Sequence, residues 1–362
     1  MNSSSLPNES YAKRTEFTYA QAYRTYYSYP QDHIEYCKGI ITKNLRENDI
    51  PLSALSQMRV FNVGPGREAL ALHALGAKKV FHADISSVAV GSLKKYVQAH
   101  GLVDISTAQM DLCDEGALGD YLDGKIEFVY MSGILQHLRS PEMAFRNLNH
   151  FLGEGSYVFI RHYLTGAWKW LVVALLRQLI PYTTYECVEE VCCRKLGISA
   201  DAAYETRFMQ GLIDSAYVPN HDLYSPPCID RYFEANGWKK VSQDNLRQGP
   251  HYFAKGYDHN TPGLGAEGIS LMYQRVTCGH AMSGFPMPVD QLRDIEYSVE
   301  LKDLIQQFEA VKNRVALSES PLLAAGAIVE LYALGYAGWD ACPPSSQEKY
   351  QVLRKIVESL LA

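Results

Sequence analysis

Three short segments of this sequence place glycines and carboxylates at spacings that suit a nucleoside ligand. Gly64-Pro65-Gly66 follows the alternating run 59–63 and predicts a tight turn, where two absent side chains let the backbone approach a ligand closely. Asp84 follows Gly66 by 18 residues, about the distance at which a β-α-β nucleotide site presents an acid to the ribose hydroxyls. Asp111 offers a second carboxylate farther along the chain. Together these residues predict half of a nucleoside-binding site.

Parallel strands are needed to bring these residues together, and the sequence predicts such strands. Apolar runs with strand character occur at residues 59–63, 79–83, 105–111, 126–131 and 156–162. Runs with helical spacing separate them, at residues 68–75, 87–100, 118–122 and 141–152. This alternation is typical of an α/β, doubly wound, Rossmann-like sheet, whose ligands bind at the carboxyl ends of the strands.

A further motif follows the fourth predicted strand. Residues 132–138, SGILQHL, come directly after the buried run 126–131. With the glycine turn, Asp84 and Asp111, this motif resembles the class I S-adenosylmethionine-dependent methyltransferases, in particular the small-molecule group that includes the quinone-biosynthesis C-methyltransferases. The resemblance covers residues 58–257. It implies a seven-stranded sheet and S-adenosylmethionine as the cofactor.

The resemblance also implies a role for each segment of the cofactor site. In this family the glycine turn accommodates the methionine part of the cofactor. The acid after the second strand, here Asp84, holds the ribose, and the acid after the third strand, here Asp111, reaches the adenine amino group. The cofactor-binding residues expected on this basis are Gly64, Pro65, Gly66, Asp84, Ile85, Asp111, Leu112, Ser132 and Gly133.

The end of the predicted sheet bears on the choice between two cofactors. The pattern Gly64-x-Gly66-x-x-Ala69 also satisfies the relaxed dinucleotide motif, so the turn alone leaves NAD open. Residues 226–236 predict a helix, and residues 238–244 and 251–257 predict two strands close in sequence. The methyltransferase sheet ends in this way, with its last strand antiparallel, whereas a nicotinamide domain normally continues with parallel strands. S-adenosylmethionine is therefore preferred to NAD.

The chemistry of methyl transfer indicates which residues to examine as catalytic groups. A sulfonium methyl is already activated, so no metal is required, and orientation can supply ~7–11 kcal/mol of the barrier. An acceptor that starts protonated needs a base, and His137 lies after the fourth strand at the sheet's carboxyl edge. The alternative is that His137 only packs or caps the next helix. His162 and Arg161 end the fifth strand at the same edge, and Arg161 suits a carboxylate on the acceptor.

The N-terminal residues 1–50 are predicted to form a helical lid, after a start of about fifteen residues that reads as disordered. The run 17–36 is rich in tyrosine, and three of its tyrosines, Tyr26, Tyr27 and Tyr29, precede Pro30. One interpretation is an amphipathic helix packed on the main domain. The other is that these tyrosines wall the acceptor pocket, with Tyr26 and Tyr27 contacting the acceptor and Tyr29 acting in catalysis.

The remaining segments complete the predicted domain organisation. The methyltransferase domain spans 51–257 and contains a helical insertion at 164–225, whose apolar run 167–180 is too short to span a membrane, since about 20 residues are needed. Glycine and proline residues predict a linker at 258–288, with 269–277 as a further candidate strand. Residues 289–362 predict a C-terminal helical region that docks on the core, forms a homodimer or binds a partner. The sheet is expected to be complete by residue 257, so the core should fold without this region.

Composition limits the classes of function. The 362 residues are 47% hydrophobic and 20% charged, which is typical of a globular protein with a large core. A net charge of −6 gives no basic surface for nucleic acid. The first residues contain no apolar signal sequence, and the eight cysteines form no CxxC pair, so we expect reduced thiols and a cytoplasmic location.

These observations favour a methyltransferase that acts on an oxygen or nitrogen atom of a small molecule. Aminocarboxypropyl transfer from S-adenosylmethionine is the alternative within the same cofactor class. An NAD(P)-dependent oxidoreductase is the alternative with a different cofactor. A non-catalytic binding subunit is disfavoured, because the glycine turn and both acids are intact.

Overall fold

A computed structural model describes residues 11–22, 29–163, 165, 167–242, 268–277, 284–295, 297–336 and 346–361. Within these residues one seven-stranded sheet has the order β3-β2-β1-β4-β5-β7-β6. The strands are β1 (Arg59–Val63), β2 (Lys79–Asp84), β3 (Ile105–Gln109), β4 (Ile126–Ser132), β5 (Leu152–Tyr163), β6 (Trp238–Lys240) and β7 (Gly268–Arg275). The α/β Rossmann-like sheet predicted from the sequence is confirmed.

Strand register brings the candidate site residues to one edge of the sheet. β1 runs parallel to both β2 and β4, and Val63 lies opposite Ala83 and Met131. The segments that follow these three strands therefore leave the sheet at the same level. β7 runs antiparallel to its neighbours β5 and β6, as the methyltransferase resemblance implies.

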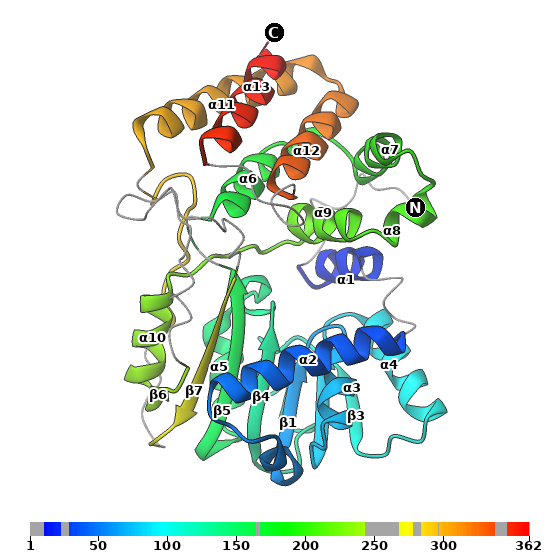
Figure 1. The fold of residues 1–362 in the computed structure, drawn as a ribbon, viewed down its shortest axis with the longest axis vertical. Helices are drawn as coiled ribbons and strands as arrows, with labels where there is room; N and C mark the ends of the chain where they lie inside the picture. Colours follow the sequence, from blue (N-terminus) through cyan, green and yellow to red (C-terminus); the bar gives the residue numbers. More distant parts are fainter. Residues whose placement is uncertain are drawn as a thin grey trace.

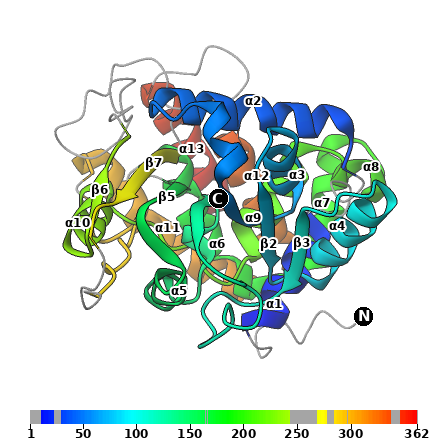
Figure 2. The same cartoon turned by 90° about the horizontal axis from the view of Figure 1, so that it is seen from below.

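Alternation along the strands gives the sheet two buried faces, each covered by helices (Figure 2). The helices flanking the sheet are α2 (Gln31–Glu47), α3 (Arg67–Ala74), α4 (Ser87–Ala99), α5 (Pro141–Asn149) and α10 (Pro226–Ala235). Val60 and Phe128 belong to the apolar cluster that includes α2, α3 and α4. Phe61 and Val129 belong to the other cluster, which includes α5 and α10. Because strand side chains alternate, each strand contributes to both cores.

The remaining helices gather beyond the carboxyl edge of the sheet and form a helical cap (Figure 1). They are α6 (Trp168–Arg177), α7 (Tyr185–Leu196), α8 (Ala200–Tyr204), α9 (Arg207–Tyr217), α11 (Val299–Ser318), α12 (Pro321–Tyr336) and α13 (Ser346–Leu361). The apolar helix α12 packs against α6, α7 and α9. The C-terminal region and the insertion therefore share one core. α1 (Tyr11–Ala22) lies between this cap and the sheet, in contact with α9 and α4.

Several sequence predictions about boundaries are wrong. β7 lies within 258–288, the range predicted as a linker, so the sheet is not complete at residue 257 and the candidate strand 269–277 belongs to it. The expected strand at 251–257 falls outside the described residues. Residues 118–122 form turns instead of a helix, and α1 begins inside the start that reads as disordered. None of the described helices is long and apolar enough to cross a membrane.

Candidate active site

The glycine turn joins β1 to α3 and has the backbone conformation that its sequence predicts. Gly64 has φ +134° and Gly66 has φ +91°, both in the region that favours glycine. Gly66 caps the N-terminus of α3, and its carbonyl oxygen accepts a hydrogen bond from the Leu70 amide at 3.2 Å. The turn therefore lacks a side chain at positions 64 and 66, directly after β1.

Tyr29 supports this turn and lies apart from the other predicted catalytic residues. Its buried hydroxyl donates to the carbonyl oxygen of Pro65 at 3.1 Å and lies 3.4 Å from that of Ala89. A Cβ atom on Gly66 would lie 2.9 Å from the Tyr29 hydroxyl oxygen and 3.1 Å from a methyl carbon of Leu93. The space beside Gly66 is thus filled by the protein itself. In this placement Tyr29 holds the glycine turn against α4, and its catalytic role remains a prediction.

Asp84 ends β2 as a partly buried acid, which fits the ribose role implied by the resemblance. One carboxylate oxygen accepts a hydrogen bond from the Ser86 amide at 2.7 Å. Burial raises the pKa of Asp84 to about 7, against the lowering effect of that hydrogen bond. Among the described residues, no lysine, arginine or histidine forms an ion pair with Asp84, unlike Asp111, Asp114 and Asp230. A partly buried carboxyl with capacity for further hydrogen bonds suits the two hydroxyls of a ribose, so the site fits S-adenosylmethionine.

Asp111 follows β3 and is held by the chain on both of its oxygens. The Cys113 amide donates to one oxygen at 2.8 Å. Arg139 donates to the other oxygen through its Nε at 3.3 Å and its Nη2 at 3.2 Å. The oxygen bound by Cys113 retains a second lone pair, whereas the other already accepts two hydrogen bonds. Adenine recognition by Asp111 and Leu112 remains a prediction, with Arg139 as a neighbour that the sequence did not indicate.

His137 lies in a short helical turn after β4 and is buried, with 5% of the residue exposed. Its Nδ1 atom lies 2.9 Å from the carbonyl oxygen of Asn220, to which only a protonated nitrogen can donate. In the neutral ring Nε2 therefore carries the lone pair. Burial lowers the pKa of His137, with Asp214 acting in the opposite sense.

The end of the insertion fixes the segment that carries His137. The Asn220 side chain donates to the carbonyl oxygen of Leu138 at 3.0 Å, and the Asp222 amide donates to that of Gln136 at 2.9 Å. With the His137–Asn220 hydrogen bond, these contacts bind residues 220–222 to residues 136–138. The insertion thus orients the imidazole.

Four polar side chains, His137, Tyr163, Asp214 and His221, meet above β4 and β5, and we call them the His137 cluster. Nε2 of His137 lies 3.9 Å from Oδ1 of Asp214. The Tyr163 hydroxyl donates to Oδ2 of Asp214 at 3.3 Å. The His221 ring centre lies 5.9 Å from that of His137 and 5.4 Å from that of Tyr163. Within the described residues, His137 Nε2, Asp214 Oδ1 and His221 Nε2 are buried without a hydrogen-bond partner.

Helix α1 packs over this cluster and contacts it through Tyr19 and Tyr11. The Tyr19 ring meets His137 edge to face at 6.0 Å, and the Tyr11 hydroxyl donates to the His137 carbonyl oxygen. Glu16 accepts from the amide of Ser87 at the start of α4 at 3.2 Å. Thr18 donates to the carbonyl oxygen of Tyr217 in α9 at 3.2 Å. These contacts hold α1 over the carboxyl edge, where the predicted lid would act.

The structure separates the other predicted site residues from the His137 cluster. His162 is buried, and its Nδ1 lies 2.8 Å from the carbonyl oxygen of Tyr163. Burial lowers the pKa of His162 to about 4. Ile160 belongs to the apolar cluster that includes α10, so strand alternation places His162 on the same face of the sheet. Arg161 is exposed and alternates to the opposite face. Tyr26 and Tyr27 lie outside the described residues.

Ser132 ends β4 and Gly133 follows it beside the glycine turn, and their contact with the cofactor remains a prediction. A Cβ atom on Gly64 would lie 3.5 Å from the side chain of Ile134, so this segment and the turn are neighbours. Sequence reasoning missed Asp214, Asn220 and His221. The only signal for Asn220 and His221 was the short run PNHD at 219–222, which closes an otherwise helical insertion, and Asp214 had none.

Comparisons with known proteins identify the family. A family profile described as "Methyltransferase domain" matches residues 35–243. No curated protein matches the chain at a significant level.

Among solved structures, YcgJ protein from Bacillus subtilis is 11% identical with a TM-score of 0.39, over 67% of this chain and 99% of that one. An S-adenosylmethionine-dependent methyltransferase from Clostridium acetobutylicum is 13% identical with a TM-score of 0.29, over 35% and 49%. StiE O-MT is 19% identical with a TM-score of 0.29, over 34% of this chain, and the match spans 41% of the StiE chain.

The profile spans more than half of the chain, and its range contains the glycine turn, Asp84, Asp111 and His137 on one sheet of the expected strand order. The chain therefore belongs to the methyltransferase-domain family, that of the class I S-adenosylmethionine-dependent methyltransferases that its sequence resembles.

Proposed function

We propose that this protein transfers a methyl group from S-adenosylmethionine to an oxygen or nitrogen atom of a small-molecule acceptor. The observation that carries the proposal is the setting of His137. Its Nδ1 is engaged by Asn220, its Nε2 carries a lone pair, and it lies at the carboxyl edge five residues after Ser132. A buried, neutral imidazole in this position is suited to accept a proton from the acceptor.

Bound S-adenosylmethionine would supply a methyl group already activated by its positively charged sulfur. The chain's contribution is binding, orientation and proton transfer. Asp84 binds the ribose hydroxyls, and the glycine turn lets the backbone approach the methionine part. His137 Nε2 takes the acceptor's proton, while Tyr19 and the rest of the His137 cluster keep water away from it.

Two alternatives from the sequence differ in the support they retain. The family match disfavours an NAD(P)-dependent oxidoreductase. Aminocarboxypropyl transfer would use the same cofactor residues, but a base beside the acceptor serves either reaction equally, so product analysis must separate them. The likeness to quinone-biosynthesis C-methyltransferases remains a prediction.

Calorimetry with S-adenosylhomocysteine and with NAD tests the cofactor part of the proposal. We expect S-adenosylhomocysteine to bind and NAD not to bind. Mass spectrometry of acceptors incubated with the enzyme and S-adenosylmethionine then tests the reaction, since methyl transfer adds 14 Da and aminocarboxypropyl transfer adds far more. Binding of NAD alone would contradict the proposal.

A further inference from the structure

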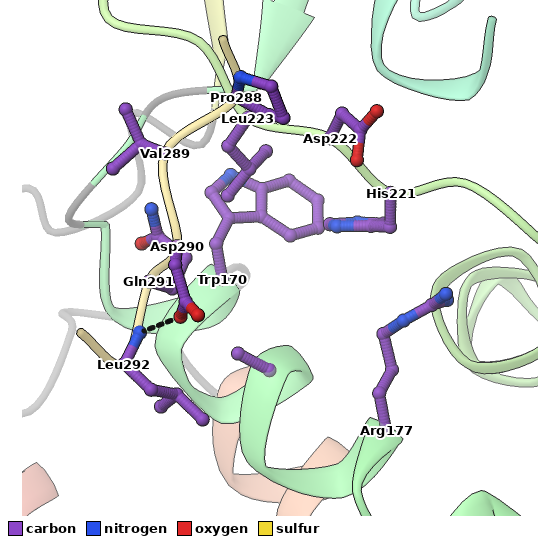
Figure 3. Close-up of a pocket in the computed structure, with 11 residues that line it drawn as sticks. Trp170, Arg177, His221, Asp222, Leu223, Pro288, Val289, Asp290, Gln291 and Leu292 are labelled. Carbon is purple, nitrogen blue, oxygen red and sulfur yellow. Dashed lines mark hydrogen bonds between the residues drawn. The ribbon is translucent and has the colours of Figure 1, made fainter. Parts of the chain in front are cut away.

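Figure 3 shows a cavity of about 380 Å³ whose lining residues come from α6 and from residues 221–223 and 288–292. The lining includes neither Asp84 nor Asp111, so this cavity and the predicted cofactor site are built from different residues. The contacts that bear on the adenine base lie instead at the ends of β3 and β4, where residues 111–114 meet residues 139–147.

Four hydrogen bonds join these two segments without the help of any charged group. The Ser140 amide donates to Sγ of Cys113 at 3.3 Å, and the Cys113 thiol donates to the Ser140 carbonyl oxygen at 3.3 Å. The Asn147 side chain of α5 donates to the carbonyl oxygens of Leu112 and Asp114 at 2.8 and 2.7 Å. The backbone of the loop after β3 is therefore held in place without an ion pair.

The Asp111 carboxylate, in contrast, is oriented by a charged partner. Arg139 donates to its Oδ2 through Nε at 3.3 Å and Nη2 at 3.2 Å, and the Cys113 amide donates to its Oδ1 at 2.8 Å. Donors on both oxygens fix the plane of the carboxylate, because rotation about its Cβ–Cγ bond would break these hydrogen bonds. The Asp111 side chain is 12% exposed and the Arg139 side chain 46%, which places the guanidinium on the solvent side of the carboxylate.

This arrangement leaves Asp111 one position for a ligand. A carboxylate has about four lone-pair sites, two on each oxygen. Oδ2 already accepts two hydrogen bonds from Arg139, and Oδ1 accepts one from the Cys113 amide. A ligand can therefore donate a single N–H to Oδ1. The 6-amino group of adenine supplies such an N–H, and its hydrogen bond is strong only when the acceptor is held in line with the donor.

We propose that Arg139 is a positioning residue for adenine selectivity, which holds Oδ2 of Asp111 and thereby directs Oδ1 toward the 6-amino group of the cofactor. This inference rests on the proposed function and specifies how the base of the cofactor is recognised. Asp114 accepts from Nη2 of Arg139 at 2.7 Å and holds the guanidinium from its other side. Without the guanidinium the carboxylate can rotate, so the amino group contributes less to binding.

The test compares S-adenosylhomocysteine with its deamino analogue, in which a hydrogen atom replaces the 6-amino group. Calorimetry gives both affinities for each variant, and their ratio measures the contribution of the amino group alone. We expect the parent protein to prefer S-adenosylhomocysteine by at least about tenfold, because the analogue leaves Oδ1 of Asp111 without its donor. Asp111→Ala should abolish this preference. Arg139→Ala should reduce it to about threefold or less, while the affinity for the deamino analogue changes by less than about twofold.

Two further variants distinguish positioning from a general effect of the arginine. Arg139→Lys keeps the positive charge but lacks the planar fork of donors, so its preference should lie between those of the parent and Arg139→Ala. Arg146→Ala is the matched control, because Arg146 also pairs with an exposed carboxylate, that of Glu142 at 2.9 Å. It should leave the ratio of affinities unchanged.

The outcomes separate this inference from the proposed function. Failure of S-adenosylhomocysteine to bind the parent protein would overturn the proposed function. If it binds, a ratio that Arg139→Ala leaves at the parental value would overturn only the inference, even if both affinities fall, since Arg139 would then act on the loop as a whole. Equal affinities of the parent for the two ligands, or a preference that survives in Asp111→Ala, would also overturn it.

Discussion

At the scale of single residues, Asp84 determines how cofactor affinity should depend on pH. The carboxyl has a pKa of about 7 because it is buried, and ribose hydroxyls bind best to its ionised form. We expect the affinity for S-adenosylhomocysteine to fall below pH 7, by up to about tenfold per pH unit. Calorimetry between pH 5.5 and about 8 measures this dependence.

Two aspartate-to-asparagine variants test whether the pH dependence of cofactor affinity comes from Asp84 or from acidic residues in general. Asp84→Asn should weaken S-adenosylhomocysteine binding by about 1–3 kcal/mol, since the ribose loses a charged hydrogen-bond acceptor. It should also flatten the pH profile. Asp104→Asn, at the exposed amino end of β3, should bind as the parent does. An unchanged affinity in Asp84→Asn would remove Asp84 from the cofactor site.

Gly66 gives a second prediction at this scale. Gly66→Ala should lower the melting temperature, because φ is +91° and the new Cβ would lie 2.9 Å from the Tyr29 hydroxyl. Strain of this kind costs about 1–3 kcal/mol. Adding Tyr29→Phe removes the hydroxyl and should recover part of the loss. The control is Gly91→Ala in α4, whose new Cβ would meet nothing within 4 Å. Equal melting temperatures for the two alanine variants would contradict steric crowding between the new Cβ at position 66 and Tyr29.

At the scale of secondary-structure elements, α1 is the part whose removal should matter most to the site. Its contacts reach the His137 turn, the start of α4 and the end of α9. Deleting residues 1–22 should expose the backbone of residues 134–138 to solvent. Hydrogen exchange followed by mass spectrometry should show faster exchange there, while β2, on the inside of the sheet, keeps its protection. No change at 134–138 would mean that α1 is not a lid.

At the scale of the whole molecule, the C-terminal helices belong to the same core as the insertion. Leu331 of α12 is fully buried, whereas Leu317 of α11 is 85% exposed. Leu331→Ala should lower the free energy of unfolding by about 2–5 kcal/mol. Leu317→Ala should change it by less than about 0.5 kcal/mol. Urea unfolding of both variants measures these free energies. Similar losses in the two variants would contradict a core shared by the C-terminal helices and the insertion.

Stability of the whole molecule should also fall in acid because several histidines are buried in neutral form. Burial lowers the pKa of His82 to about 3 and that of His162 to about 4, and lowers those of His137 and His221 as well. Unfolding releases these rings to bind protons below pH 6.5. The unfolded state therefore binds more protons, and the free energy of unfolding should decrease as pH falls from 6.5 to about 4.

Asp84 acts in the opposite sense over part of this range. Its raised pKa makes the folded state bind a proton between pH 7 and about 4, which offsets the effect of one histidine. His82→Gln should reduce the loss of stability in acid by up to about 1.4 kcal/mol per pH unit. His100→Gln, at an exposed position, should leave the slope unchanged. Stability that is constant from pH 6.5 to 4 would contradict the buried neutral state of these rings.

The sequence by itself determined the parts of this protein that depend on local pattern. Strand and helix periods located β1 to β5 and their order, since apolar alternation reflects burial on a sheet. The glycines at φ +134° and +91° were predictable because glycine suits this backbone conformation, and the acid at the end of β2 was found by its spacing from that turn. The position of His137 at the carboxyl edge followed from the parallel sheet alone.

Tertiary structure decided what depends on contacts between residues distant in sequence. Asp214, Asn220 and His221 meet His137 only because the insertion folds back onto the turn after β4. Tyr29 lies against Gly66 because its hydroxyl donates to the carbonyl oxygen of Pro65, a contact between residues 36 positions apart. β7 was assigned to a linker because the flanking glycines and prolines obscured a strand whose partners, β5 and β6, precede it in the chain. Short-range pattern carries no information on such pairings, since their stability comes from packing formed only in the folded chain.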